Sequence, residues 1–213
     1  MNYEILVNKE NSIDIEYMKD VIEPSLVEIE FTRDNDEIFE EFNITSKKIY
    51  LESETAKAWY QLKQFLVNQG IEFDICSGFL SLENQSYKYN SFLKRNGIEM
   101  TERRMSKPRY SEHHTGLAID CDYFKNDDWA GICSDDNPET KYIHSILHDF
   151  GFILRYPKHK QEITGMQYEP WHIRYVGKEL AKKLYEEDLT LEEYYLRKKV
   201  LWYDTNRNRK ITN

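Results

Sequence analysis

The sequence predicts an α+β fold, in which a single domain holds a small antiparallel sheet flanked by helices and a functional site lies in a cleft on the sheet. Helical patterns precede and interrupt a few short alternating strands instead of alternating regularly with them. No Gly-rich phosphate loop of the common types is present. Because 213 residues suit one domain, we expect residues 1–204 to form it and residues 205–213 to be a polar tail.

The helix expected over residues 53–68 is the clearest element, because its apolar residues recur at helical spacing. Ser53 is expected to cap this helix and Gly70 to end it. Apolar and polar residues alternate over 71–76 and again over 117–122, which predicts two strands. In the second strand, the alternation puts apolar side chains on one face and acidic side chains on the other.

Caps and breakers predict the remaining elements. A helix is expected to start at Pro138 behind the capping residue Asn137 and to end at Gly151. The pattern Thr190-x-x-Glu193 is a capping box that opens the last helix. The other expected segments are a helix at 82–95 closed by Gly97, a basic loop at 101–110, an acidic loop at 133–139, strands at 152–156 and 171–176, and helices at 178–187 and 190–202.

Composition and charge exclude several classes of protein. Lys+Arg 29 against Asp+Glu 38 gives a net charge of −9, which repels phosphate backbones and argues against a nucleic-acid partner. No run approaches the roughly 18 apolar residues of a membrane span. The first residues lack the features of a signal peptide, so a cytoplasmic location is expected; removal of a leader would instead place the protein outside the cell, at the cell wall.

Two histidines, His113 and His172, lie in clusters with carboxylates at the edges of expected elements. A catalytic zinc ion takes three protein ligands of the nitrogen and oxygen type and keeps a fourth position for water. His113, Asp120 and His172 would supply these ligands, and Glu169 could act on that water as a general base. The spacing alone leaves open that these residues are ordinary pairs of a histidine and a carboxylate joined by hydrogen bonds.

At these residues the sequence resembles a known enzyme family. The motifs are Ser111-x-His113-x-x-Gly116-x-Ala118-x-Asp120 and Glu169-x-Trp171-His172. They look like the paired signature of the zinc D-Ala-D-Ala carboxypeptidases of the VanY type, of the VanX dipeptidases and of the bifunctional VanXY enzymes. The likeness runs from the N-terminus to about residue 200.

The resemblance implies a zinc metallopeptidase linked to vancomycin resistance that removes the terminal D-Ala from peptidoglycan precursors or splits free D-Ala-D-Ala. It makes His113, Asp120 and His172 the zinc ligands and Glu169 the catalytic base. Ser111 and Gln85 match positions that the family uses near the bound peptide. Trp171 is expected to fix the direction of His172 and to form a wall of the substrate pocket.

One position departs from the family pattern, since Leu80 stands where the family has an arginine that holds a substrate carboxylate or the developing oxyanion. Another cation could substitute, and Arg109, Arg104, Lys107 and Arg155 are the candidates. Alternatively, the protein is a weakly active or non-catalytic zinc-binding relative that binds cell-wall peptides. A third possibility is an L,D-carboxypeptidase or an endopeptidase acting on stem peptides.

Overall fold

The computed structural model describes residues 1–30, 48–125, 128–129 and 137–200. All of its strand pairs are antiparallel, in one five-stranded and one two-stranded sheet. The larger sheet has the order β3 (Glu72–Ser77), β4 (Ala118–Lys125), β7 (His172–Tyr175) and β6 (Phe152–Leu154), with β5 (Asp128–Trp129) paired to β4; the smaller one joins β1 (Leu26–Ile29) to β2 (Ile49–Glu52). The predicted α+β class is therefore confirmed.

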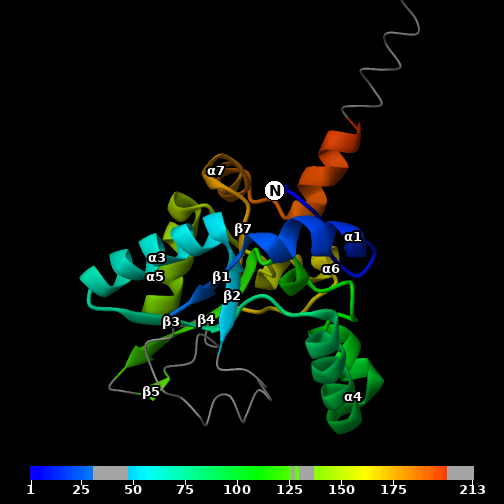
Figure 1. The fold of residues 1–213 in the computed structure, drawn as a ribbon. Helices are drawn as coiled ribbons and strands as arrows, with labels where there is room; N and C mark the ends of the chain where they lie inside the picture. The colour runs from blue at the N-terminus through cyan, green and yellow to red at the C-terminus, as the bar shows by residue number, and fades with distance from the viewer. Residues whose placement is uncertain (31–47, 126–127, 130–136, 201–213) are drawn as a thin grey trace, which may run out of the picture.

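Helices α3 (Ser53–Asn68) and α5 (Pro138–Ile146) cover one face of the larger sheet (Figure 1). Trp59 and Leu62 of α3 are fully buried and belong to one apolar cluster with alternate residues of β3, β4 and β7. Since successive side chains of a strand point to opposite faces, the polar residues of β4 and β7 are left on the other face. The core thus determines which face of the sheet can hold a polar site.

The helix caps agree with the sequence at two ends and differ at one. Asn137 caps α5 as expected. Thr190 and Glu193 form the predicted capping box: the Thr190 N–H donates to Glu193 Oε2 at 2.9 Å, and the Glu193 N–H donates to Thr190 Oγ1 at 3.2 Å. At α3 the cap is Glu52 and not Ser53, because the Glu52 carboxylate accepts from two backbone N–H groups of the first turn at 3.0 Å.

Helix α4 (Leu82–Arg104) is longer than expected and is sharply bent. Gly97 has a φ of 75° and does not end the helix; a second helical arm follows it and takes in Arg103 and Arg104. The Tyr89 hydroxyl donates to Glu102 Oε1 at 3.1 Å. In a straight helix these residues would lie about 20 Å apart, so the two arms fold back on each other and the predicted basic loop begins only after Arg104.

The N-terminal elements were not predicted from the sequence. They form a small apolar cluster of their own, which includes Val7, Ile13 and Ile22. The remaining elements are α1 (Ile15–Tyr17), η1 (Met18–Ile22), η2 (Glu23–Ser25), η3 (Glu112–Thr115), η4 (Leu147–Phe150), η5 (Lys158–Lys160), α6 (Gln161–Thr164), α7 (Lys178–Glu186) and a helix at 191–200. The expected tail at 205–213 and most of the acidic loop at 133–139 lie outside the described residues. Among the helices of the described ranges, none is long and apolar enough to cross a membrane.

Candidate functional site

The pairing of β4 with β7 brings two of the predicted site residues together. Asp120 and His172 are direct cross-strand partners in this register, so their side chains stand side by side on the polar face of the sheet. His172 Nδ1 lies 3.0 Å from Asp120 Oδ1. Two residues that are 52 positions apart in the chain thus become neighbours through strand pairing.

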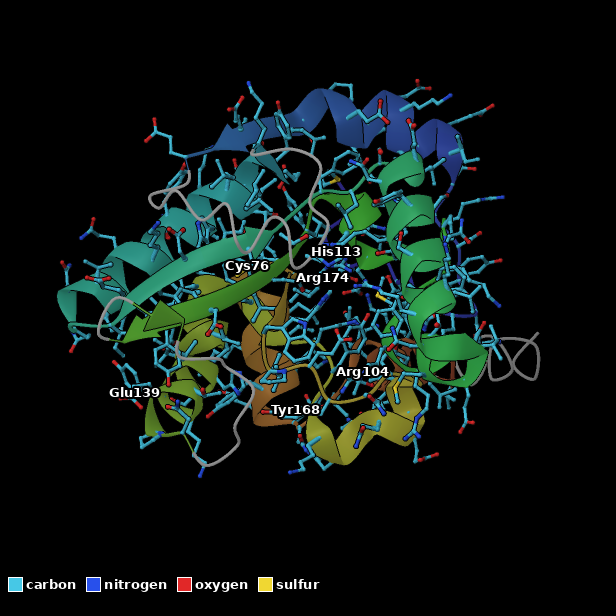
Figure 2. All side chains as sticks on the ribbon, turned by 90° about the horizontal axis from the view of Figure 1, so that it is seen from below. Cys76, Arg104, His113, Glu139, Tyr168 and Arg174 are labelled. Atoms are coloured by element: carbon cyan, nitrogen blue, oxygen red, sulfur yellow. The ribbon has the colours of Figure 1, made fainter. Side chains whose placement is uncertain are left out.

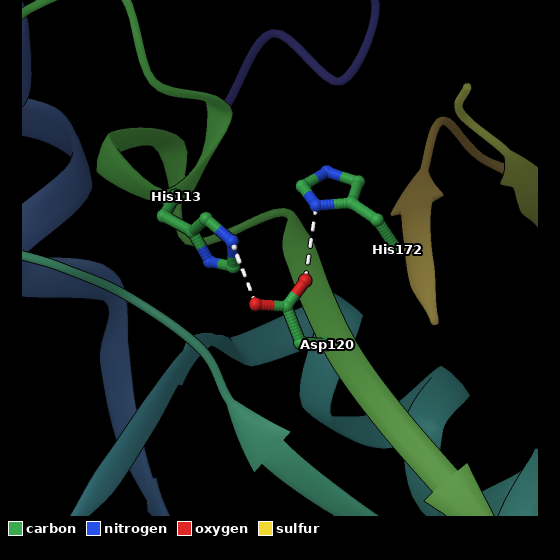
Figure 3. Close-up of side chains that lie close together, drawn as sticks. All are labelled: His113, Asp120 and His172. Carbon is green, nitrogen blue, oxygen red and sulfur yellow. Dashed lines mark hydrogen bonds and ion pairs between the residues drawn. The ribbon is translucent and has the colours of Figure 1, made fainter. Parts of the chain in front are cut away.

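His113 reaches the same place from the short helix η3. This helix ends at Gly116, whose φ of 66° is the left-handed conformation that glycine adopts without strain. His113 Nδ1 is 2.7 Å from the carbonyl oxygen of Gly78, and its Nε2 is 3.3 Å from Asp120 Oδ2 (Figure 3). A Cβ atom on Gly78 would lie only 2.5 Å from Tyr50 O, so this close packing of the backbone behind His113 requires glycine.

This donor set fits a divalent cation. His113, Asp120 and His172 each offer one ligand atom, and these atoms lie within 4.8 Å of one another. The Gly78 carbonyl can only accept, so His113 donates through Nδ1 and its neutral imidazole has a lone pair on Nε2. That lone pair faces a carboxylate oxygen, an arrangement of two acceptors that needs a proton or a cation between them. Two imidazoles and one carboxylate are also ligands that zinc prefers.

A buried ion cluster lies behind His172. Glu112 Oε1 accepts from Arg155 Nε and from Arg174 Nη1, both at 2.8 Å, and all three side chains are fully buried. Arg155 is also paired with Glu192. The other oxygen, Glu112 Oε2, is 3.5 Å from His172 Nε2. Glu112 is therefore placed to orient the imidazole from the side opposite Asp120, as carboxylates do behind metal-binding histidines.

Glu169 lies beside His172, with its Oε2 3.7 Å from His172 Nδ1. Burial raises the pKa of Glu169 to about 8. Burial disfavours a charged His172, but the nearby carboxylates of Asp120 and Glu112 outweigh it and raise the pKa of His172 to about 10. Burial likewise opposes ionisation of Asp120, yet His113 and His172 hold its pKa well below the usual range. The group attracts positive charge, and a divalent cation there would lower the pKa of Glu169.

A cavity of about 510 Å³ opens from this group between α4 and the sheet. Figure 2 shows His113 in the middle of this region, with Arg104 and Tyr168 farther out. Three predicted substrate-binding residues, Ser111, Gln85 and Trp171, line it. Gln85 is held by a hydrogen bond from Nε2 to the carbonyl oxygen of Ser106. All four members of the predicted metal and base set, His113, Asp120, His172 and Glu169, also line the cavity.

The two arginines predicted to bind substrate lie elsewhere. Arg155 is fully buried in the ion cluster, and Arg109 is exposed, and neither lines the cavity. Glu112 and Lys88 also line the cavity, and neither was predicted from the sequence as a residue of the site. Glu112 lies inside the histidine motif, and Lys88 follows Gln85 by three residues, a spacing that puts both on one face of a helix. The place of Glu112 in the motif and the spacing of Lys88 from Gln85 are the features of the sequence that could have indicated these two residues.

Comparisons with known proteins identify relatives of this chain. It is 34% identical over 193 residues to YodJ of Bacillus subtilis, covering 89% of this chain and 66% of YodJ. It is 39% identical over 151 residues to the bifunctional D-Ala-D-Ala dipeptidase and D-Ala-D-Ala carboxypeptidase VanXYC of Enterococcus gallinarum, covering 69% of this chain and 78% of VanXYC. The chain spans about half the length of a D-alanyl-D-alanine carboxypeptidase of Enterococcus faecium.

Solved structures share the fold. The LD-carboxypeptidase LdcB matches with a TM-score of 0.73 and 31% identity over 89% of this chain and 84% of that one. A mutant of the D,D-pentapeptidase VanY from a VanB-type resistance cassette, in complex with Zn(II), matches with a TM-score of 0.70 and 28% identity over 92% of this chain and 99% of that one. Fold and site together define a peptidase. The family model described as VanY, D-alanyl-D-alanine carboxypeptidase, matches residues 48–178, and the chain belongs to this family.

Proposed function

We propose that this protein is a zinc-dependent carboxypeptidase that hydrolyses the terminal D-Ala-D-Ala bond of peptidoglycan precursors. The observation that carries the proposal is the convergence of His113, Asp120 and His172 beside the buried Glu169 at a cavity. The name of VanXYC supports the substrate class, and the Zn(II) complex of the VanY relative supports the metal.

In this mechanism His113, Asp120 and His172 would hold the zinc ion. When bound, zinc polarises the peptide carbonyl and makes water a nucleophile at neutral pH. Glu169 accepts the proton of the attacking water on its carboxylate and later returns it to the leaving amine of D-Ala. Glu112, on the Nε2 side of His172, fixes the orientation of its imidazole. Ser111, Gln85 and Trp171 form the wall against which the peptide lies.

Release of D-Ala tests this proposal. The purified protein is incubated with zinc and either D-Ala-D-Ala or a pentapeptide stem ending in D-Ala-D-Ala. We expect D-Ala to form, to stop after treatment with a chelator, and to resume when zinc is added back. Because water would need the zinc ion to become a nucleophile at neutral pH, residual activity after complete removal of the metal would contradict the mechanism.

The LdcB likeness favours a second candidate, an L,D-carboxypeptidase that acts on tetrapeptide stems. A parallel incubation with a tetrapeptide stem separates the two, because mass analysis of the products shows which bond is cut. Cleavage of the tetrapeptide alone would replace the proposed D,D specificity. If zinc binds and no peptide is cleaved, the protein is the non-catalytic relative that Leu80 suggests.

A further inference from the structure

The cavity needs a cation that can bind the carboxylate of a peptide, and Leu80 cannot serve. Leu80 lines the cavity at the position where the family has an arginine, and its side chain is apolar. Its backbone N–H donates to the carbonyl oxygen of His113 at 3.3 Å. The position is therefore close to the metal group, the name used below for His113, Asp120 and His172. A carboxypeptidase acts next to the charged end of its substrate, and an unpaired carboxylate in a cleft is costly.

Of the basic residues proposed from the sequence, only Arg104 lines the cavity. Arg155 is committed to Glu112 and Glu192 inside the ion cluster, and Lys107 forms an exposed ion pair with Glu102. Arg104 lines the cavity but donates to Gln167 at 2.8 Å. Among the described residues, the other basic side chains of the cavity are Lys88 and Arg95, both on the first arm of α4.

Lys88 is the better placed of the two. Gln85, Lys88 and Phe92 all line the cavity, at the spacing of three and four residues that forms one face of a helix. This arm begins at Leu82, two residues after Leu80, so Lys88 lies about 10 Å nearer its start than Arg95 does. Lys88 and Asp120 both line the cavity; burial lowers the pKa of Lys88, and the charge of Asp120 opposes this.

Lys88 also has no ion-pair partner among the described residues. It is half-buried, and within the described ranges it forms neither a hydrogen bond nor an ion pair. Removing an ammonium group from water without a partner is unfavourable, so an anion entering the cavity would recover that energy. A flexible four-carbon stem lets an ammonium group reach a carboxylate without the fixed geometry that a guanidinium requires.

We propose that Lys88 binds the C-terminal carboxylate of the substrate peptide and replaces the arginine that is absent at Leu80. The inference rests on the proposed function, since it names the group by which the same cavity recognises a peptide end. Lys88 then binds the carboxylate of the peptide and not the developing oxyanion. Recognition of the free peptide end is then a property of α4, while the metal group and Glu169 act on the bond itself.

Equilibrium binding tests this assignment without turnover. Zinc-loaded Glu169→Gln protein is titrated by calorimetry with D-Ala-D-Ala and with its C-terminal amide. We expect the free carboxylate to bind about 10- to 100-fold more tightly, as for a hydrogen bond to a charged group. Adding Lys88→Met should abolish this preference by weakening only the carboxylate ligand, and Lys88→Arg should retain it. Lys94→Met, an exposed lysine of α4 outside the cavity, is the matched control and should change neither affinity.

The results separate this inference from the proposed function. A preference for the carboxylate that survives Lys88→Met would overturn the assignment. An equal loss of affinity for both ligands would also overturn it, because it would indicate a structural role for Lys88. If the dipeptide binds as expected and the unmutated enzyme releases no D-Ala from any peptide, the proposed function fails while the role of Lys88 stands.

Discussion

Glu169→Gln is expected to lower kcat for D-Ala release by about 100- to 10,000-fold while zinc remains bound. Glutamine keeps the shape of the side chain but cannot accept a proton, so the attacking water loses its base. Glu169 is buried beside His172, with Oε2 3.7 Å from Nδ1, but it is not a member of the group of three proposed metal ligands. The measurement is kcat for the pentapeptide, together with the zinc content of the same sample.

Glu162→Gln is the matched control for this variant. Glu162 is an exposed carboxylate on α6, seven residues before Glu169 in the chain, and does not line the cavity. We expect its kcat and zinc content to equal those of the unmutated protein. Full activity in Glu169→Gln would remove Glu169 as the base. Loss of zinc together with activity would make it a ligand instead.

Glu112→Ala is expected to lower the free energy of unfolding by about 3–5 kcal/mol. The variant would leave Arg174 without its carboxylate and Arg155 with only Glu192, and both guanidinium groups are fully buried. The two arginines outweigh burial and hold the pKa of Glu112 well below its usual value. This stabilisation is therefore present above the pKa of an unfolded glutamate and is lost as the pH falls through the lower, folded pKa. Urea denaturation at pH 7 measures the change.

Glu187→Ala supplies the comparison for an exposed ion pair. Glu187 pairs with Arg197 at the same 2.8 Å distance, but both side chains are exposed. We expect a loss of less than about 1 kcal/mol. Glu112→Ala should also weaken zinc binding by about 10- to 100-fold, because His172 loses the carboxylate that orients it. A loss in Glu112→Ala no larger than that in Glu187→Ala would show that the buried cluster contributes little to stability.

The parts of the fold that depend on local patterns were predictable from the sequence. Helix α3 follows from its apolar spacing, and the capping box at Thr190 follows from side-chain chemistry. The bend in α4 was not predictable, because glycine usually ends a helix, whereas here a second arm follows Gly97 and contacts the first through Tyr89 and Glu102. The smaller sheet was missed because β1 and β2 are separated by residues 30–48 in the chain.

Part of the candidate site was likewise predictable from the sequence, and part was not. The motifs around His113 and His172 indicated the group that the structure brings together, since alternation along β4 puts Asp120 on the polar face. The surroundings depend on long-range pairing that no local pattern encodes. Arg155 meets Glu112 across 43 residues and is buried there, whereas the sequence left open whether it would bind substrate or form a salt bridge with a carboxylate. Lys88 reaches the cavity because α4 lies across it from the polar face of the sheet.

The central claim is that one zinc ion binds between β4, β7 and η3. The most direct measurement is anomalous diffraction at the zinc absorption edge from crystals of the protein grown with zinc. We expect a single strong peak in contact with His113, Asp120 and His172, and its absence from crystals of His172→Ala. A peak bound by other residues, or none at these three side chains despite zinc in the crystal, would contradict the account.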